Sequence, residues 1–130
     1  MMSDKAKPLL MVLDDDNAIR QTWDIIFRQH GYEVVPVARG AAAIEAAHLR
    51  APDLLLADIH LPDMSGIEVA LRIHQIAPAC HILLISGDSS SSGALDEARA
   101  QGISFEVLPK PISPADLIRR IDERLRRRAS

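Results

Sequence analysis

Residues 54–66 read LLLADIHLPDMSG. Four apolar residues lead to Asp58, and apolar residues at helical spacing resume at about Gly66. A short run that is apolar throughout is typical of a strand buried on both faces, because a half-exposed strand would alternate apolar and polar residues. This stretch therefore predicts a buried strand that ends at an aspartate, then a loop, and then a helix.

The same order of strand, loop and helix recurs along the rest of the chain. Strands are expected at residues 9–13, 33–37, 54–57, 81–85 and 105–108, and helices at 18–30, 41–50, 66 onward, 94–101 and 114 onward. The first helix places Ile19, Trp23, Ile26 and Phe27 on one face, and Ser113 before Pro114 suits a helix start. Because strands of this kind need cover on both faces, five such units imply an α/β fold with a parallel sheet between two helix layers.

Length and composition limit the classes of function. The chain has 130 residues, 48% of them hydrophobic, so we expect residues 1–130 to form one domain with a real core. A net charge of −3 disfavours nucleic acid as a partner. The lone cysteine, Cys80, excludes an intrachain disulfide and fits the cytoplasm, and no apolar stretch is long enough to cross a bilayer.

Polar residues gather where the predicted strands end. These are Asp14-Asp15-Asp16, Asp58, Ser86-Gly87 and Pro109-Lys110-Pro111, after the first, third, fourth and fifth strands. In an open parallel sheet, ligands bind beyond the carboxyl ends of the strands. Carboxylates that share one crevice repel one another and raise one another's pKa unless positive charge compensates. A hard divalent cation together with Lys110 would supply that charge.

These pieces resemble the receiver domains of bacterial response regulators, which belong to two-component signalling. The resemblance rests on the order and spacing of VLDDD (12–16), DIHLPDMSG (58–66), LISG (84–87) and LPKP (108–111), and covers essentially the whole chain. It implies a flavodoxin-like, doubly wound (βα)5 fold with strand order 2-1-3-4-5. It also implies a phosphoacceptor that catalyses only its own phosphorylation and dephosphorylation, and is otherwise not an enzyme.

The resemblance implies a role for each acidic residue at the strand ends. Asp58 would be the nucleophile that accepts a phosphoryl group to give an aspartyl phosphate. Asp15 and Asp58 would bind Mg²⁺ directly, Asp14 would act through water, and the backbone carbonyl of His60 would add an oxygen. Mg²⁺ prefers six oxygen ligands and keeps several waters, which suits a site with few protein ligands.

Further roles concern charge balance and signalling. Lys110 would balance charge on the phosphoryl oxygens, and Ser86 would hydrogen-bond one of them and draw its loop inward. Receiver domains usually carry an aromatic switch residue three positions before the lysine, where this chain has Val107. Phe105 could take that role only if the strand is bulged.

The lifetime of the phosphorylated state forms a separate hypothesis. His60 and Asp88, two residues beyond Asp58 and Ser86, would flank the path of the hydrolytic water. An acidic Asp88 would orient that water and shorten the lifetime, whereas the bulky His60 would obstruct it.

The partners implied are a histidine kinase or phosphotransfer protein, and an unknown output partner on the face formed by the fourth helix, fifth strand and fifth helix. A homodimer that forms through the last helix on phosphorylation is a further alternative.

Three other functions remain as alternatives. A haloacid-dehalogenase-like phosphatase would need a carboxylate two residues after its nucleophile, where this chain has His60. A binding-only receiver would not need the acids and Lys110. A flavodoxin-like mononucleotide carrier would need a glycine-rich phosphate-binding loop where this chain has Asp14 to Asp16. Those three aspartates could also simply cap the first helix.

Overall fold

The computed structural model describes residues 7–87, 96, 99, 100, 102 and 105–129. Its strands are β1 (Leu9–Leu13), β2 (Glu33–Val37), β3 (Leu54–Asp58), β4 (His81–Ser86) and β5 (Glu106–Pro109), and its helices are α1 (Asn17–Gln29), α2 (Gly40–Leu49), α3 (Gly66–Ile76) and α5 (Pro114–Ala129). The predicted strands and these four helices are confirmed, with boundaries shifted by about one residue. The helix predicted at 94–101 lies largely outside the described residues, although 96, 99 and 100 are helical.

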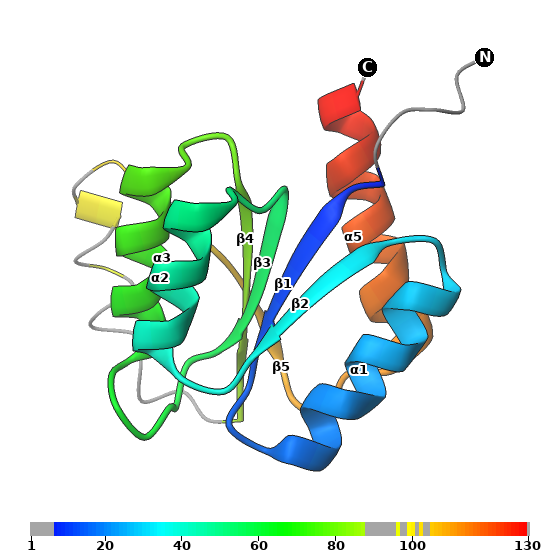
Figure 1. Cartoon of the computed structure of the whole chain (residues 1–130), viewed down its shortest axis with the longest axis horizontal. Coiled ribbons are helices and arrows are strands. Elements are labelled where there is room, and N and C mark those ends of the chain that lie inside the picture. Colours follow the sequence, from blue (N-terminus) through cyan, green and yellow to red (C-terminus); the bar gives the residue numbers. More distant parts are fainter. Residues whose placement is uncertain (1–6, 88–95, 97–98, 101, 103–104, 130) are drawn as a thin grey trace.

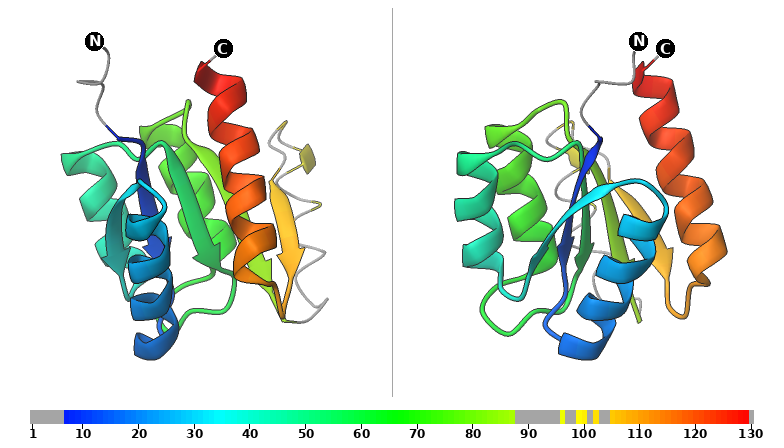
Figure 2. Two further views of the ribbon diagram at one scale, coloured as in Figure 1. Left: turned by 90° about the vertical axis from the view of Figure 1, so that its right-hand side faces the viewer. Right: turned by 45° about the vertical axis from the view of Figure 1, so that its right-hand side comes forward.

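All five strands pair in parallel, in the order β2-β1-β3-β4-β5, which confirms the predicted α/β topology. Helices α2 and α3 cover one face of the sheet, and α1 and α5 cover the other (Figures 1 and 2). The strands run downward in Figure 1, so the loops after β1 and β3 meet along the lower side of the sheet. The predicted polar strand ends are therefore brought together at one edge.

The sheet separates two apolar clusters. Alternate residues of β1 enter opposite clusters: Met11 and Leu13 pack on the side of α2 and α3, while Leu10 and Val12 pack on the side of α1 and α5. This follows from the period of two residues along a strand. Of the four residues that the sequence places on one face of the first helix, Ile19 is 38% exposed, whereas Phe27 is buried. No helix among the described residues is both long and apolar enough to span a membrane.

Local caps fix where the helices begin beside this edge. The Asp16 carboxylate accepts hydrogen bonds from the Ala18 and Ile19 backbone N–H groups at 2.9 and 3.1 Å, so it caps α1 as its position suggested. Ser65 does the same for α3 through the Ile67 N–H at 3.1 Å. Ser113 accepts from the Asp116 N–H at 3.1 Å, at the start of α5.

Candidate functional site

Asp58 lies at the centre of the candidate site. It is the last residue of β3, the middle strand of the sheet, and is only 7% exposed. Its Oδ2 accepts a hydrogen bond from Lys110 Nζ at 2.7 Å, and its Oδ1 accepts one from the His60 backbone N–H at 2.9 Å. The carboxylate is therefore held by a cation on one oxygen and by its own loop on the other.

Three carboxylates converge at this point. Oxygen atoms of Asp14, Asp15 and Asp58 lie within 4.8 Å of one another. Asp14 is 8% exposed and accepts a hydrogen bond from the Asp16 N–H at 2.9 Å, whereas Asp15 is exposed. All three donors are hard oxygen atoms, which Mg²⁺ prefers, and the exposed side of the cluster leaves room for metal-bound water. The residues present fit a hard divalent cation.

The electrostatics of the acidic cluster favour added positive charge. Burial raises the pKa of the Asp14 carboxyl, and the negative charge of Asp58 raises it further, against the lowering effect of the hydrogen bond from Asp16. Partial burial acts to lower the pKa of Lys110, but the hydrogen bond and charge of Asp58, with the charges of Asp14 and Asp15, together raise it. Lys110 therefore stays protonated among three acids, and its single charge does not balance theirs.

The ends of β4 and β5 complete the candidate site. Ser86, the last residue of β4, is 6% exposed, and its carbonyl oxygen accepts a hydrogen bond from the Lys110 N–H at 2.9 Å. The Ile59 N–H donates to the Ile85 carbonyl at 3.0 Å. These bonds join the backbones that carry the predicted nucleophile, serine and lysine, so the structure brings together Asp14, Asp15, Asp58, Ser86 and Lys110.

Gly66 has a role in the site that the sequence did not reveal. The Gly66 N–H donates to the Ile59 carbonyl at 2.7 Å and closes the loop between β3 and α3. A Cβ atom at this position would lie 2.2 Å from the Asp58 carbonyl oxygen and 2.8 Å from the Ile59 Cα. Only glycine allows α3 to start this close to the end of β3.

The remaining predicted residues lie in different surroundings. The His60 side chain, two residues after Asp58, is exposed, and Asp88 lies outside the described residues. Val107 pairs with Leu84 and is half-buried, while Phe105 lies just before β5 and packs on the same side of the sheet. The β4–β5 pairing is regular from Glu106 to Pro109, so the bulge that would let Phe105 replace Val107 is absent from these paired residues.

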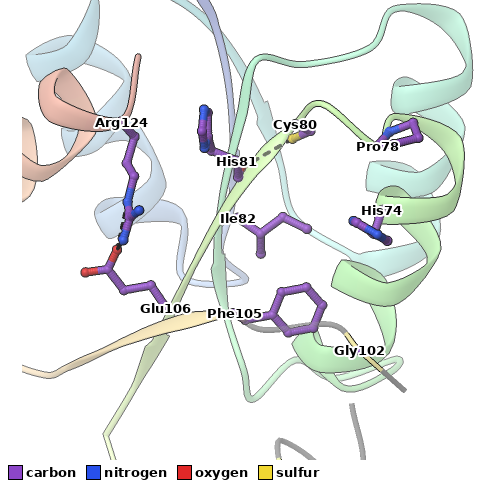
Figure 3. Close-up of a pocket in the computed structure, with 9 residues that line it drawn as sticks. All are labelled: His74, Pro78, Cys80, His81, Ile82, Gly102, Phe105, Glu106 and Arg124. Atoms are coloured by element: carbon purple, nitrogen blue, oxygen red, sulfur yellow. Dashed lines mark hydrogen bonds and ion pairs between the residues drawn. The ribbon is translucent and has the colours of Figure 1, made fainter. Parts of the chain in front are cut away.

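A pocket of about 360 Å³ lies at the other end of β4 and β5 (Figure 3). It is lined by His74, Pro78, Cys80, His81, Ile82, Gly102, Phe105, Glu106 and Arg124. His81 and Glu106 are the first residues of their strands, so this pocket is distant from the acidic cluster at the carboxyl ends. Glu106 and Arg124 are joined by an ion pair, and no three metal-ligating groups converge among the described residues of this pocket. The acidic edge therefore remains the candidate site.

The fold and the acidic edge define an α/β protein with a buried aspartate beside a lysine and a candidate metal site, and comparison with known proteins places it in a family. The model of the response regulator receiver domain matches residues 10–122, so the chain belongs to that family. It is a receiver domain of the kind found in two-component systems.

Curated relatives extend beyond the region they share with this chain. The transcriptional activator protein PfeR of Pseudomonas aeruginosa is 36% identical over 125 residues, which cover 92% of this chain and 38% of PfeR. The probable transcriptional regulatory protein TcrX of Mycobacterium tuberculosis is 27% identical over 118 residues, covering 91% of this chain and 50% of TcrX. The chain thus spans about half or less of the length of these relatives.

Solved structures of receiver domains have the same fold as this chain along nearly their whole length. A CheY-like response regulator receiver domain protein from Methanospirillum hungatei has a TM-score of 0.85 at 28% identity, covering 94% of this chain and 96% of that one. Chemotaxis protein CheY4 of Vibrio cholerae has a TM-score of 0.78 at 28% identity, covering 91% and 98%. The predicted flavodoxin-like receiver fold is therefore confirmed.

Proposed function

We propose that this chain is a phosphoacceptor whose Asp58 takes a phosphoryl group in a Mg²⁺-dependent reaction. The observation that carries the proposal is the buried Asp58 carboxylate, 2.7 Å from Lys110 Nζ and clustered with Asp14 and Asp15. A carboxylate that only stabilised the fold would gain nothing from two further acids beside it. Their mutual repulsion is accounted for by a function that brings in a cation.

The chain's own residues suggest how the reaction proceeds. An Asp58 carboxylate oxygen attacks phosphorus, the bond from phosphorus to the leaving group breaks, and the leaving group departs with the electron pair. Lys110 shifts its hydrogen bond from Asp58 to an oxygen of the transferring group and offsets its charge. Ser86 hydrogen-bonds another phosphoryl oxygen and signals occupancy to its loop.

The proposed metal ligands are the three acids and a backbone oxygen. Asp15 and Asp58 would hold Mg²⁺ directly, Asp14 through water, and His60 through its carbonyl. When bound, Mg²⁺ supplies positive charge to the carboxylates and to the incoming phosphoryl group.

The same proposal includes the proteins that would donate the phosphoryl group and respond to it. The chain would act in the cytoplasm, where a histidine kinase or phosphotransfer protein would supply the phosphoryl group and an output partner would bind the face formed by the fourth helix, β5 and α5. The chain would catalyse only its own phosphorylation and dephosphorylation. The relatives include proteins named as transcriptional regulators and as a chemotaxis protein, so the output of this chain is left open.

The test is the intact mass of the protein after incubation with acetyl phosphate or phosphoramidate. We expect one phosphoryl adduct with Mg²⁺, none with a chelator, and none on Asp58→Asn under either condition. An adduct that persists on Asp58→Asn would assign the modification to another residue. Absence of any adduct on the folded wild type would favour a binding-only receiver.

A further inference from the structure

The loop that joins Asp58, at the end of β3, to the start of α3 is anchored to a second helix, α2. Both carboxylate oxygens of Asp63, within this loop, accept hydrogen bonds from the start of α2: Oδ1 from the Gly40 N–H at 3.0 Å, and Oδ2 from the Ala41 N–H at 3.1 Å. Helix α2 lacks a local cap, because Arg39 at its N-cap makes no side-chain cap hydrogen bond. The acid that satisfies these N–H groups lies 23 positions further along the chain.

Packing reinforces this anchor. Gly40 is buried, and a Cβ atom there would lie 2.4 Å from the Met64 Cγ and 2.7 Å from a Val69 Cγ. Met64 of the same loop therefore rests directly on the start of α2. The two hydrogen bonds also lower the pKa of the Asp63 carboxyl, so it stays ionised at neutral pH and complements the positive end of the helix dipole.

The anchored loop is the one that orients the nucleophile. It is closed at its base by the bond from the Gly66 N–H to the Ile59 carbonyl, and its His60 N–H holds one oxygen of Asp58. With the base closed by that bond, the carboxylate of Asp63 restrains the middle of the loop. A loop released from α2 would let His60, and with it the Asp58 carboxylate, vary in position.

We propose that Asp63 is a positioning residue for the phosphorylation of Asp58, acting by fixing the loop from Asp58 to Gly66 against the start of α2. The inference rests on the proposed function. Asp63 itself is exposed and does not need to touch the phosphoryl donor or a metal ion. Its effect reaches the reaction only through the loop backbone.

The experiment compares phosphorylation rates of matched aspartate variants. Asp63→Ala removes both acceptors, Asp63→Asn keeps the size and one acceptor oxygen, and Asp53→Ala removes a carboxylate that binds a backbone N–H at the opposite end of β3. Each is incubated with phosphoramidate and Mg²⁺ at a temperature where circular dichroism shows it fully folded. The rate constant at saturating donor and the half-saturating donor concentration are then followed by intact mass.

A misplaced reacting group lowers the rate of the chemical step more than it lowers donor binding. We expect the saturating rate constant of Asp63→Ala to fall about 10-fold, with Asp63→Asn intermediate and Asp53→Ala unchanged. Half-saturation should change little in all three. If Asp63→Ala does not fold, the saturating rate constant of Asp63→Asn is compared with that of the wild type instead.

Two other results lead to different conclusions. Wild-type rate constants in both Asp63 variants, or an equal fall in Asp53→Ala, would overturn the positioning role while leaving the phosphoacceptor function intact. No adduct on the wild type would instead overturn the proposed function itself.

Discussion

Strand β3 has an aspartate at each end, and the fold uses the two differently. Asp53, just before the strand, accepts a hydrogen bond from the Leu9 N–H at 2.7 Å, while its own backbone N–H and carbonyl bond to Leu9 and His81. Asp58, at the far end, instead contacts Lys110 beside other acids. The Asp53 carboxylate accepts from a backbone N–H of the adjoining strand and aligns the sheet, whereas the Asp58 carboxylate is paired with the Lys110 ammonium, which the proposed function would use in the reaction.

Loss of Lys110 should produce the largest difference between the two ends of β3. In Lys110→Ala, the transferring phosphoryl group loses the positive charge of the lysine, so the rate of adduct formation on Asp58 should fall about 100-fold. Asp53→Asn should be labelled at the wild-type rate. A time course of intact mass with phosphoramidate measures both, and wild-type labelling of Lys110→Ala would remove the lysine from the chemistry.

Gly66→Ala should be the most destabilising change around Asp58. Its Cβ would overlap the Asp58 backbone, which cannot move without disturbing the middle of the sheet, so the free energy of unfolding should fall by about 3 kcal/mol or more. Urea unfolding followed by circular dichroism measures the loss.

Gly31→Ala is the matched control for this glycine. Gly31 has a φ of +99° but open space around its Cβ position, so only backbone strain of roughly 1–2 kcal/mol applies there. Equal losses at the two glycines would mean that the close approach at Gly66 relaxes easily.

Asp53→Ala should have a smaller effect on stability and none on the chemistry. It leaves the Leu9 N–H, at the start of a central strand, without its carboxylate partner, which should cost about 1–3 kcal/mol. Asp24→Ala breaks a surface ion pair with Arg28 and should cost about 0.5 kcal/mol or less. Urea unfolding compares them, and an equal cost would show that Asp53 has no special role in alignment.

The sequence was sufficient to predict which side chains lie together at the carboxyl ends of the strands. A short apolar run precedes each of Asp14, Asp58, Ser86 and Lys110. The carboxyl ends of parallel strands lie at the same edge of the sheet, and this does not depend on the conformation of the loops. The cap at Asp16 was equally local, since it depends on residues two and three positions away. Predictions of this kind need only periodicity and strand direction.

Contacts set by tertiary packing were not predictable in the same way. Asp63 caps a helix 23 positions earlier in the chain, and nothing near Gly40 indicates which acid will reach it. The need for glycine at position 66 depends on how closely α3 approaches β3, and the exposure of Ile19 on how far α1 rotates over the sheet. In each case the deciding neighbour is distant in sequence, so a pattern along the chain does not reveal it.

Asp14→Asn should have a modest effect on stability, but the direction of that effect is the most informative of these tests. Because the pKa of Asp14 is raised in the folded state, the folded protein binds that proton more tightly than the unfolded chain does. The stability this contributes is complete below the ordinary value near 3.8 and is lost as pH rises through the raised pKa. At neutral pH with chelator, Asp14→Asn should therefore be more stable than the wild type, within the ~0.5–2 kcal/mol typical of stabilising substitutions.

The same variant tests whether the acids are adapted to a cation. Asparagine keeps an oxygen that can accept from the Asp16 N–H, so this hydrogen bond should survive the change. Its advantage should disappear toward pH 4, and should shrink or reverse when Mg²⁺ is added, because metal binding stabilises the folded wild type by mass action. Urea unfolding across pH, with chelator or Mg²⁺, measures the difference. An Asp14→Asn protein less stable than the wild type in chelator would mean that Asp14, like Asp53, serves the fold.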